Sequence, residues 1–192
     1  ALTSSGVADF VIESGSVEIN DPLAAGLVEA GMLQALPIAN LVIDATDSGN
    51  YLFTSLKALA DLGVDHINTT ESKLYIDLGL PASDENAIAD IQAILTALDP
   101  ANEAKSLFGQ GQFGVLVINN ETAQAINNAG GLNQDILQDL FDLGFNEIAV
   151  ATDDLDNAVT DIVAQDPMPP VEVTVIGIDV NSELMMQHEP MK

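Results

Sequence analysis

The sequence predicts an α/β fold in which mostly parallel strands are joined by helical connections, either as an open sheet or as a short, irregular solenoid. Two observations predict it. A pattern of helix, glycine and strand recurs along the chain. Continuous runs of Val, Ile and Leu follow the helices, and such runs are typical of parallel strands buried on both faces. Of the 192 residues, 47% are hydrophobic and 18% charged, so we expect one folded domain over residues 1–192.

The repeated unit is clearest in two segments. Leu56 to Ile67 reads LKALADLGVDHI, and Leu137 to Ile148 reads LQDLFDLGFNEI. Apolar residues three and four apart predict a helix face, Gly63 or Gly144 provides a left-handed stop, and the next apolar residues begin a strand. A weaker copy, Ala30 to Leu41, has proline in place of the glycine.

A further helix is predicted from Ile88 to Leu98, where the helical pattern ends in Asp-Pro and not in glycine. We expect an edge strand at Ser16 to Ile19, where apolar and polar residues alternate, and loose ends at residues 1–6 and 181–192. The other expected strands are Phe10 to Ile12, Asn40 to Asp44, Leu74 to Leu78, Gly114 to Ile118, Ile148 to Ala151 and Val171 to Ile178.

The charge balance restricts the partners of this chain. There are 30 acidic residues against 4 basic ones, giving a formal net charge of −26. A phosphate backbone is bound by Lys and Arg, so we expect no nucleic acid as a partner. No apolar run is long enough to cross a bilayer, so we expect no membrane insertion. Self-repulsion of the acidic side chains is relieved by cations, and calcium is the one we expect.

Two acidic clusters are the candidate metal sites. Asp44 and Asp47 precede Ser48 and Asn50 in one loop, and Asp153, Asp154 and Asp156 precede Asn157 in another. Each cluster follows a predicted strand. Carboxylate oxygens are the ligands that calcium prefers, but neither loop has the Glu that closes an EF-hand. The alternative for each cluster is a solvated loop with a helix N-cap.

Two glycine-rich segments match ligand-binding motifs in their residue pattern, but neither meets the structural requirements of its motif. Gly109 to Gly114 fits G-x-G-x-x-G, but it follows a helix and precedes a strand, which is the wrong order for a dinucleotide fingerprint. We therefore predict a turn. Gly130 to Leu137 resembles one calcium-binding nonapeptide, yet a single copy cannot hold an ion between successive turns. We expect Asp135 to start a helix there.

Catalytic groups are hard to single out. The absence of cysteine excludes thiol nucleophiles, disulfides and zinc thiolate sites. His66 and His188 are too few for a transition-metal site. His66 occupies the repeat position of Glu147, so we expect it at the surface. Carboxylates are so numerous that any two could be proposed as an acid and a base.

The run Leu56 to Asp77 resembles a repeat of very large type I-secreted proteins of the RTX kind, in which a helix, Gly-Val-Asp-x-Ile and a short strand recur. The segment Leu137 to Asp154 looks similar. The resemblance implies a bacterial protein that is secreted or held at the cell surface, in calcium-rich surroundings, with a role in adhesion or surface assembly. The chain departs from that pattern by lacking tandem calcium-binding nonapeptides.

The sequence thus favours a non-enzymatic extracellular module that is structural or adhesive, stabilised by calcium, and able to associate with itself or with other surface proteins. The alternative is a hydrolase of a cell-surface polymer that uses acidic residues as catalysts. A third class, a small-molecule binding protein, would need an apolar cleft with a few polar groups. A concave pocket with converging carboxylates would favour the hydrolase over the module.

Overall fold

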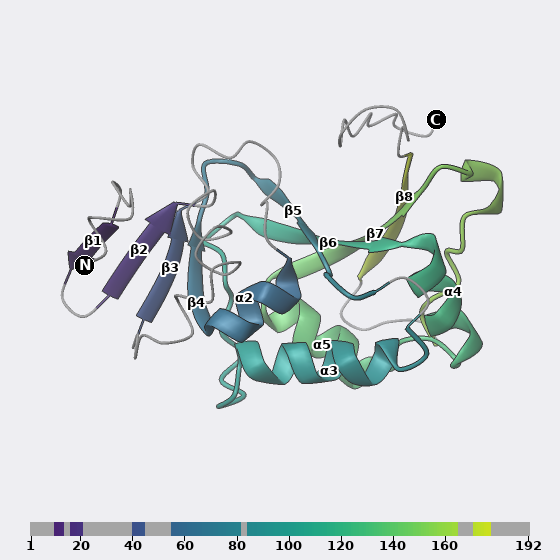
Figure 1. The fold of residues 1–192 in the computed structure, drawn as a ribbon, viewed down its shortest axis with the longest axis horizontal. Coiled ribbons are helices and arrows are strands. Elements are labelled where there is room, and N and C mark those ends of the chain that lie inside the picture. The colour runs from purple at the N-terminus through teal and green to yellow at the C-terminus, as the bar shows by residue number, and fades with distance from the viewer. Residues whose placement is uncertain are drawn as a thin grey trace.

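The computed structural model describes residues 10–13, 16–20, 40–44, 55–81, 84–164 and 171–177. They form two four-stranded sheets that lie side by side, with the helices gathered below the second sheet in the view of Figure 1. The fold is α/β with an open, mostly parallel sheet and helical connections, which confirms the predicted fold class. In the described part of the chain, no helix is long and apolar enough to cross a membrane.

The second sheet is parallel throughout and its strand order follows the chain. Its strands, in order, are β5 (Lys73–Asp77), β6 (Phe113–Asn119), β7 (Phe145–Thr152) and β8 (Glu172–Gly177). The helices between them are α3 (Ala87–Leu98), α4 (Asn120–Asn128) and α5 (Gln134–Asp142). A short 3-10 turn, η3 (Leu155–Asn157), follows β7.

The first sheet contains one antiparallel pair. Its order is β1 (Phe10–Glu13), β2 (Ser16–Asn20), β3 (Asn40–Asp44) and β4 (Val64–Asn68), and helix α2 (Leu56–Leu62) lies between β3 and β4 in the chain. Strand β2 pairs antiparallel with β1 and parallel with β3. The prediction that Ser16 to Ile19 is an edge strand was therefore wrong. Among the described strands the edge is β1, because it pairs with β2 on the side away from β3.

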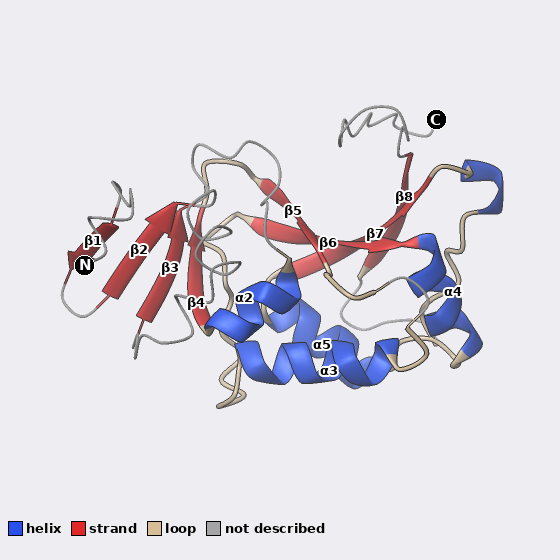
Figure 2. Ribbon diagram, in the orientation of Figure 1, coloured by secondary structure: helices blue, strands red, loops and turns tan. Residues whose placement is uncertain are grey.

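The repeated unit has the predicted local structure (Figure 2). Helix α2 begins after Ser55, whose hydroxyl accepts from the Ala58 N–H at 3.1 Å, and ends at Gly63 with φ 69°. After α5, Gly144 has φ 95° and β7 begins at the next residue. A side-chain oxygen before the helix and a left-handed glycine after it satisfy backbone groups that the helix leaves unpaired.

The start of α5 differs from the prediction in one detail. The N-cap is Asn133, whose side chain accepts from the Ile136 N–H at 3.0 Å, and Asp135 lies inside the first turn. The prediction of a helix start here is confirmed, but the capping residue was wrong. An asparagine caps as well as an aspartate, and the acid in the first turn is favourable beside the positive end of the helix.

Backbone hydrogen bonds through Leu107 connect the first sheet to the end of α5. The Ile67 N–H donates to the Leu107 carbonyl at 2.7 Å, and the Leu107 N–H donates to the Leu143 carbonyl at 3.0 Å. All three side chains are buried, and the ring of Phe108 packs edge to face against Phe145 at 5.5 Å. Strand β4 of the first repeat copy and the end of α5 in the second are thus bonded to the same extended segment.

The main core lies between the second sheet and its helices. Strand residues Leu74, Leu116 and Ile148 face α3 and α5, which contribute fully buried Ile91 and Leu140. The connection from β7 to β8 crosses the same face, since the Leu132 N–H donates to the Ile162 carbonyl at 2.7 Å and Ile162 is buried. Every described crossover of this sheet therefore covers one face.

The opposite face of the sheet combines a small apolar cluster with a polar network. Val115 and Ala149 are buried there beside Tyr75 and Phe113. The residue Glu147 is only 5% exposed, and its carboxylate accepts from Lys73 Nζ at 2.6 Å and from Thr174 Oγ1 at 2.9 Å. Three strands are thus joined through one carboxylate. The Lys73 ammonium also lies 5.4 Å from the centre of the Phe113 ring.

Candidate functional site: an acidic pocket

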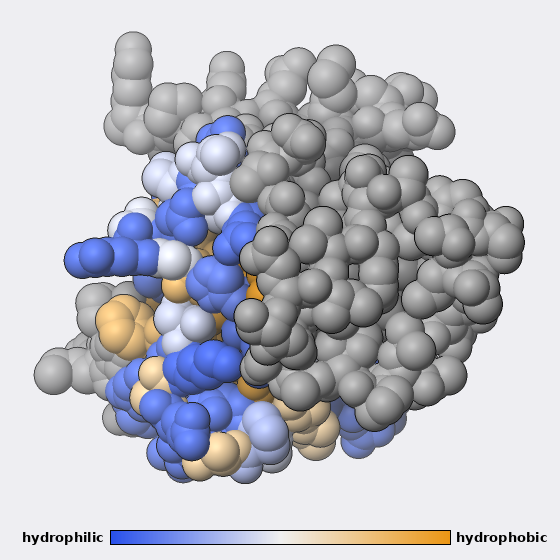
Figure 3. Space-filling model, turned by 90° about the vertical axis from the view of Figure 1, so that its left-hand side faces the viewer, coloured by the Kyte–Doolittle hydropathy of each residue, from blue (hydrophilic) through white to orange (hydrophobic). Residues whose placement is uncertain are grey.

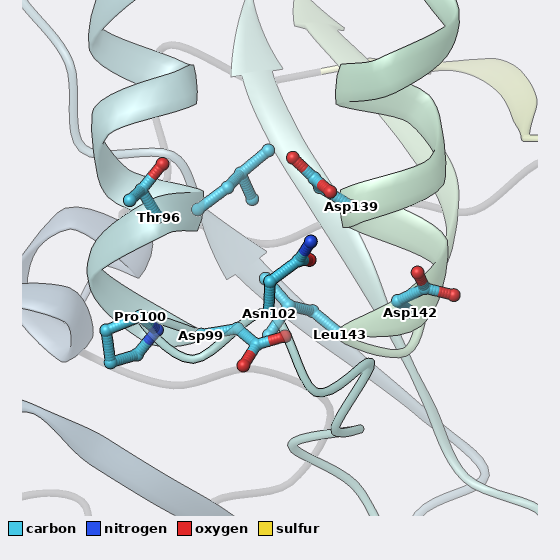
Figure 4. Close-up of a pocket in the computed structure, with 8 residues that line it drawn as sticks. Thr96, Asp99, Pro100, Asn102, Asp139, Asp142 and Leu143 are labelled. Carbon is cyan, nitrogen blue, oxygen red and sulfur yellow. The ribbon is translucent and has the colours of Figure 1, made fainter.

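A pocket of about 250 Å³ lies between the carboxyl-terminal ends of α3 and α5 (Figure 4). Three carboxylates belong to its wall, and two leucines form its apolar part. Its lining residues are Leu95, Thr96, Asp99, Pro100, Asn102, Asp139, Asp142 and Leu143. The negative ends of two helix dipoles meet here, so the surroundings favour a cation.

Asp99 has a structural task in the pocket wall. Its two carboxylate oxygens accept from the backbone N–H groups of Glu103 at 3.0 Å and Ala104 at 3.1 Å. These bonds stabilise a turn in which Asn102 and Ala104 adopt φ of 50° and 54°. The left-handed conformation is unfavourable for residues with a side chain, so Asp99 compensates part of that cost. Both oxygens of its carboxylate therefore already accept hydrogen bonds from the loop backbone.

Asp139 and Asp142 stand three residues apart on α5 and so share one side of the helix. Asp142 accepts from the Gln138 amide at 2.8 Å. Burial raises the pKa of Asp139 above its ordinary value, and the charges of Asp142, Asp135 and Asp99 raise it further. Both acids also lie near the negative end of the helix dipole, where a carboxylate is disfavoured. The ionised form of Asp139 is therefore disfavoured in this pocket.

Replacing Asp139 with asparagine is expected to stabilise the protein by a few tenths of a kcal/mol at neutral pH, the scale of screened charge effects near a surface. Because the folded pKa of Asp139 is raised, the ionised carboxylate costs stability above that pKa, and the cost disappears as pH falls towards the unfolded value of 3.8. Urea titrations of both proteins at pH 7 and pH 3.5 measure this. A gain of equal size at both pH values would contradict the electrostatic cause.

The metal candidates of the second acidic loop are exposed. Asp153, Asp154 and Asp156 follow β7, and Oδ2 of Asp154 accepts from the Asn157 amide at 2.7 Å. Asp154 also precedes the 3-10 turn, but its side chain makes no capping bond. In the described ranges, no three carboxylate or imidazole groups converge closely enough to hold one metal ion. The calcium site at this loop stays a prediction.

The first acidic loop can be placed only in part. Asp44 is the last residue of β3, and its backbone pairs with Asn20 on one side and Asn68 on the other. Its side chain, Asp47, Ser48 and Asn50 lie outside the described residues, as do the weaker repeat copy before Asn40 and the ends at 1–6 and 181–192.

The glycine segment from Gly109 to Gly114 is a turn, as predicted. The Gln112 N–H donates to the Gly109 carbonyl at 3.1 Å, Gly111 has φ 81°, and β6 begins at Phe113. No helix starts here, so no helix dipole points at a phosphate. His66 is half-buried on β4 and not fully at the surface as expected.

Sequence reasoning missed the pocket. Asp99 and Asp139 stand far apart in the chain, and only the packing of α3 against α5 brings them together. The available indications were the Asp-Pro helix end and the spacing of Asp139 and Asp142 on one helix face. Comparisons with protein-family models, with curated proteins and with solved structures found no match for this chain.

Proposed function

We propose that this chain is a non-enzymatic structural or adhesive module of a bacterial protein that is secreted or held at the cell surface. The observation that carries the proposal is the strand order β5-β6-β7-β8, with every pair parallel. Parallel crossovers have one hand, so when each strand adds to the same edge the connections cover one face. Ligand crevices of open α/β sheets form where the strand order reverses. The described part of this sheet has no such reversal.

The surface chemistry supports the same proposal. Each lysine in the described ranges is already paired with a carboxylate: Lys57 with Asp61, Lys73 with Glu147, and Lys105 with Asp65. None of these three lysines is left for the other acids of the described ranges, and hydrophilic residues prevail on the coloured part of the surface in Figure 3. A surface of this kind repels copies at low ionic strength, while cations let them approach. We propose calcium as the physiological cation and other surface proteins, or further copies, as the partners.

Calcium is expected to raise the melting temperature more than magnesium does at equal ionic strength. A ligand at 100 times its dissociation constant adds about 2.7 kcal/mol, or roughly 5 to 10 °C for a chain of this size. Calorimetric melting with each ion measures the effect.

The control for the calcium effect is a matched pair of variants. The triple variant D153N/D154N/D156N removes the predicted loop site, whereas D139N/D142N removes two pocket carboxylates. Loss of the calcium increment in the loop variant alone places the ion at the loop. Equal shifts with calcium and magnesium in the unmodified protein would reduce the effect to charge screening and contradict a specific site.

The second candidate is a cell-surface polymer hydrolase, and the acidic pocket is the observation that favours it. An acid and base pair needs two neighbouring carboxyl groups, one of them with a raised pKa, and Asp139 lies beside Asp142 in the pocket with its pKa raised. The hydrogen bonds of Asp99 to its own loop argue against the hydrolase, because they occupy the third carboxylate of the pocket. Release of reducing ends from a bacterial surface glycan, lost in Asp139→Asn, would establish the hydrolase and displace the proposal above.

A further inference from the structure

The acidic pocket is a cavity with two kinds of wall. Its volume of about 250 Å³ has room for about eight water-sized groups. Leu95 and Leu143 form its apolar part, and each residue is only 2% exposed because it belongs to the core. In Figure 4, Asn102 lies between the two helix ends, with Asp139 on the α5 side. A lining of this kind suits a ligand that combines a short apolar stem with a polar head.

The described residues do not neutralise the negative charge of the pocket. Helices α3 and α5 both end here, and neither has a basic residue in its last turn. The carboxyl-terminal end of a helix favours a cation. The three lysines of the described ranges are paired elsewhere, with Asp61, Glu147 and Asp65. None of these lysines serves the pocket, so the cation that it favours is a ligand.

Asp139 is the carboxylate that is free to receive this cation. It is half-buried, burial and neighbouring acids raise its pKa, and no hydrogen bond from another described residue opposes that rise. Asp99 already accepts two backbone hydrogen bonds, and Asp142 accepts one from Gln138. A cation bound beside Asp139 would lower the pKa of this carboxyl, and the protein would bind the cation more weakly at acid pH.

The geometry favours an organic cation over a metal ion. In the described ranges, no three carboxylate or imidazole groups converge closely enough to hold one metal ion. An ammonium group is a compact charge with three donors, so it can contact Asp139, Asp142 and the Asn102 carbonyl together. A guanidinium group is planar, and its fork is matched to a single carboxylate. The pocket therefore suits an alkylammonium group better than a metal ion or a guanidinium.

We propose that the pocket binds the ammonium group of a lysine side chain presented by a partner protein. The proposal rests on the proposed adhesive role and names the chemistry of the partner. The ammonium lies beside Asp139 and Asp142, and the methylene stem lies along Leu95 and Leu143. A second copy of this chain is not the expected donor, because each lysine of its described ranges already has a carboxylate partner. The net charge of −26 attracts a basic partner.

Model ligands test the site. Nα-acetyl-lysine amide represents the side chain of the partner, and Nα-acetyl-norleucine amide keeps the stem without the charge. Binding is followed by two-dimensional NMR as changes in the chemical shifts of backbone amides. We expect the lysine ligand to bind at least tenfold more tightly than the norleucine ligand, because hydrogen bonds to charged groups are strong. The largest shifts are expected at Asn102 and Leu143.

Two variants of equal charge separate the pocket from general attraction to an acidic protein. Asp139→Asn is expected to weaken the binding of the lysine ligand at least tenfold. Asp135→Asn changes the same charge in the first turn of the same helix, outside the pocket, and is expected to leave binding within twofold. Circular dichroism establishes that both variants are folded. Equal weakening in the two variants would overturn the site.

A free amine is distinguished from a lysine side chain by n-butylamine, which has the same stem and charge without a backbone. If n-butylamine binds at least tenfold more tightly than the lysine ligand, the partner lysine is overturned as the occupant. Absence of any shift with the lysine ligand overturns the site itself. The calcium melting test of the proposed function is then unaffected, because its loop variant leaves the pocket carboxylates in place.

Discussion

Replacing Lys73 with methionine is expected to lower the free energy of unfolding by about 2 to 3 kcal/mol at neutral pH, because the buried Glu147 carboxylate loses its main partner. The Glu147 side chain is 7% exposed and that of Lys73 is 42% exposed. Water can reach the lysine end of the pair, so the expected loss is at or below the lower end of the range for fully buried ion pairs. Urea unfolding with linear extrapolation measures it.

The double variant K73M/E147M is the control for this prediction. When both charges are replaced by apolar groups of similar length, no buried charge remains, and stability is expected to return to within about 1 kcal/mol of the unmodified protein. Thr174→Val removes only the second hydrogen bond to Glu147 and is expected to cost about 1 kcal/mol. A double variant as unstable as Lys73→Met would show that the unpaired Glu147 charge is not the cause of the loss.

The pH dependence gives an independent check on the ion pair. The hydrogen bond to Glu147 raises the pKa of Lys73 above its ordinary value of 10.5. A raised lysine pKa contributes stability that is complete below the unfolded value and is lost as pH rises through the folded value. The unmodified protein should therefore lose this contribution only above about pH 10.5.

The sequence predicted the repeated unit because local rules decide it. Helix periodicity, a left-handed glycine and a following apolar run all lie within about a dozen residues, and each is satisfied by short-range backbone chemistry. Gly63 and Gly144 both adopt positive φ, and a strand follows each one. Continuous apolar strands likewise predicted the parallel pairing of β6 with β7.

The features that were missed depend on contacts between distant segments. Helix α4 reads NETAQAINN and buries only Thr122, Ala123 and Ile126, so its sequence has too few large apolar residues to mark a helix face. Glu147 occupies the repeat position of His66 and looked like a surface residue, yet it is buried because Lys73 and Thr174 on neighbouring strands satisfy its oxygens. The register that aligns these strands cannot be predicted from the sequence of any single strand.

Gly144→Ala is expected to destabilise the protein by about 2 to 4 kcal/mol, the sum of backbone strain and overpacking. At φ 95°, any side chain is strained. A methyl group at this position would also lie 2.6 Å from Ser106 Oγ and 2.8 Å from Phe108 Cδ2. Phe108 is held against Phe145, so its ring cannot move aside without disturbing the core.

Gly63→Ala is the matched control, because the repeat places this glycine at the equivalent helix end. Its φ is 69°, and nothing lies within 4 Å of the added methyl group, so only the backbone cost of about 1 kcal/mol is expected. Thermal melting of both variants should show a loss at Gly144 at least twice that at Gly63. Equal losses would mean that segment 106–108 moves to accommodate the methyl group. Its backbone hydrogen bonds would then hold it less rigidly than their geometry indicates. A second variant, Ser106→Ala with Gly144→Ala, separates the two contacts: recovery of stability would identify the serine oxygen as the obstacle and leave the Phe108 ring in place.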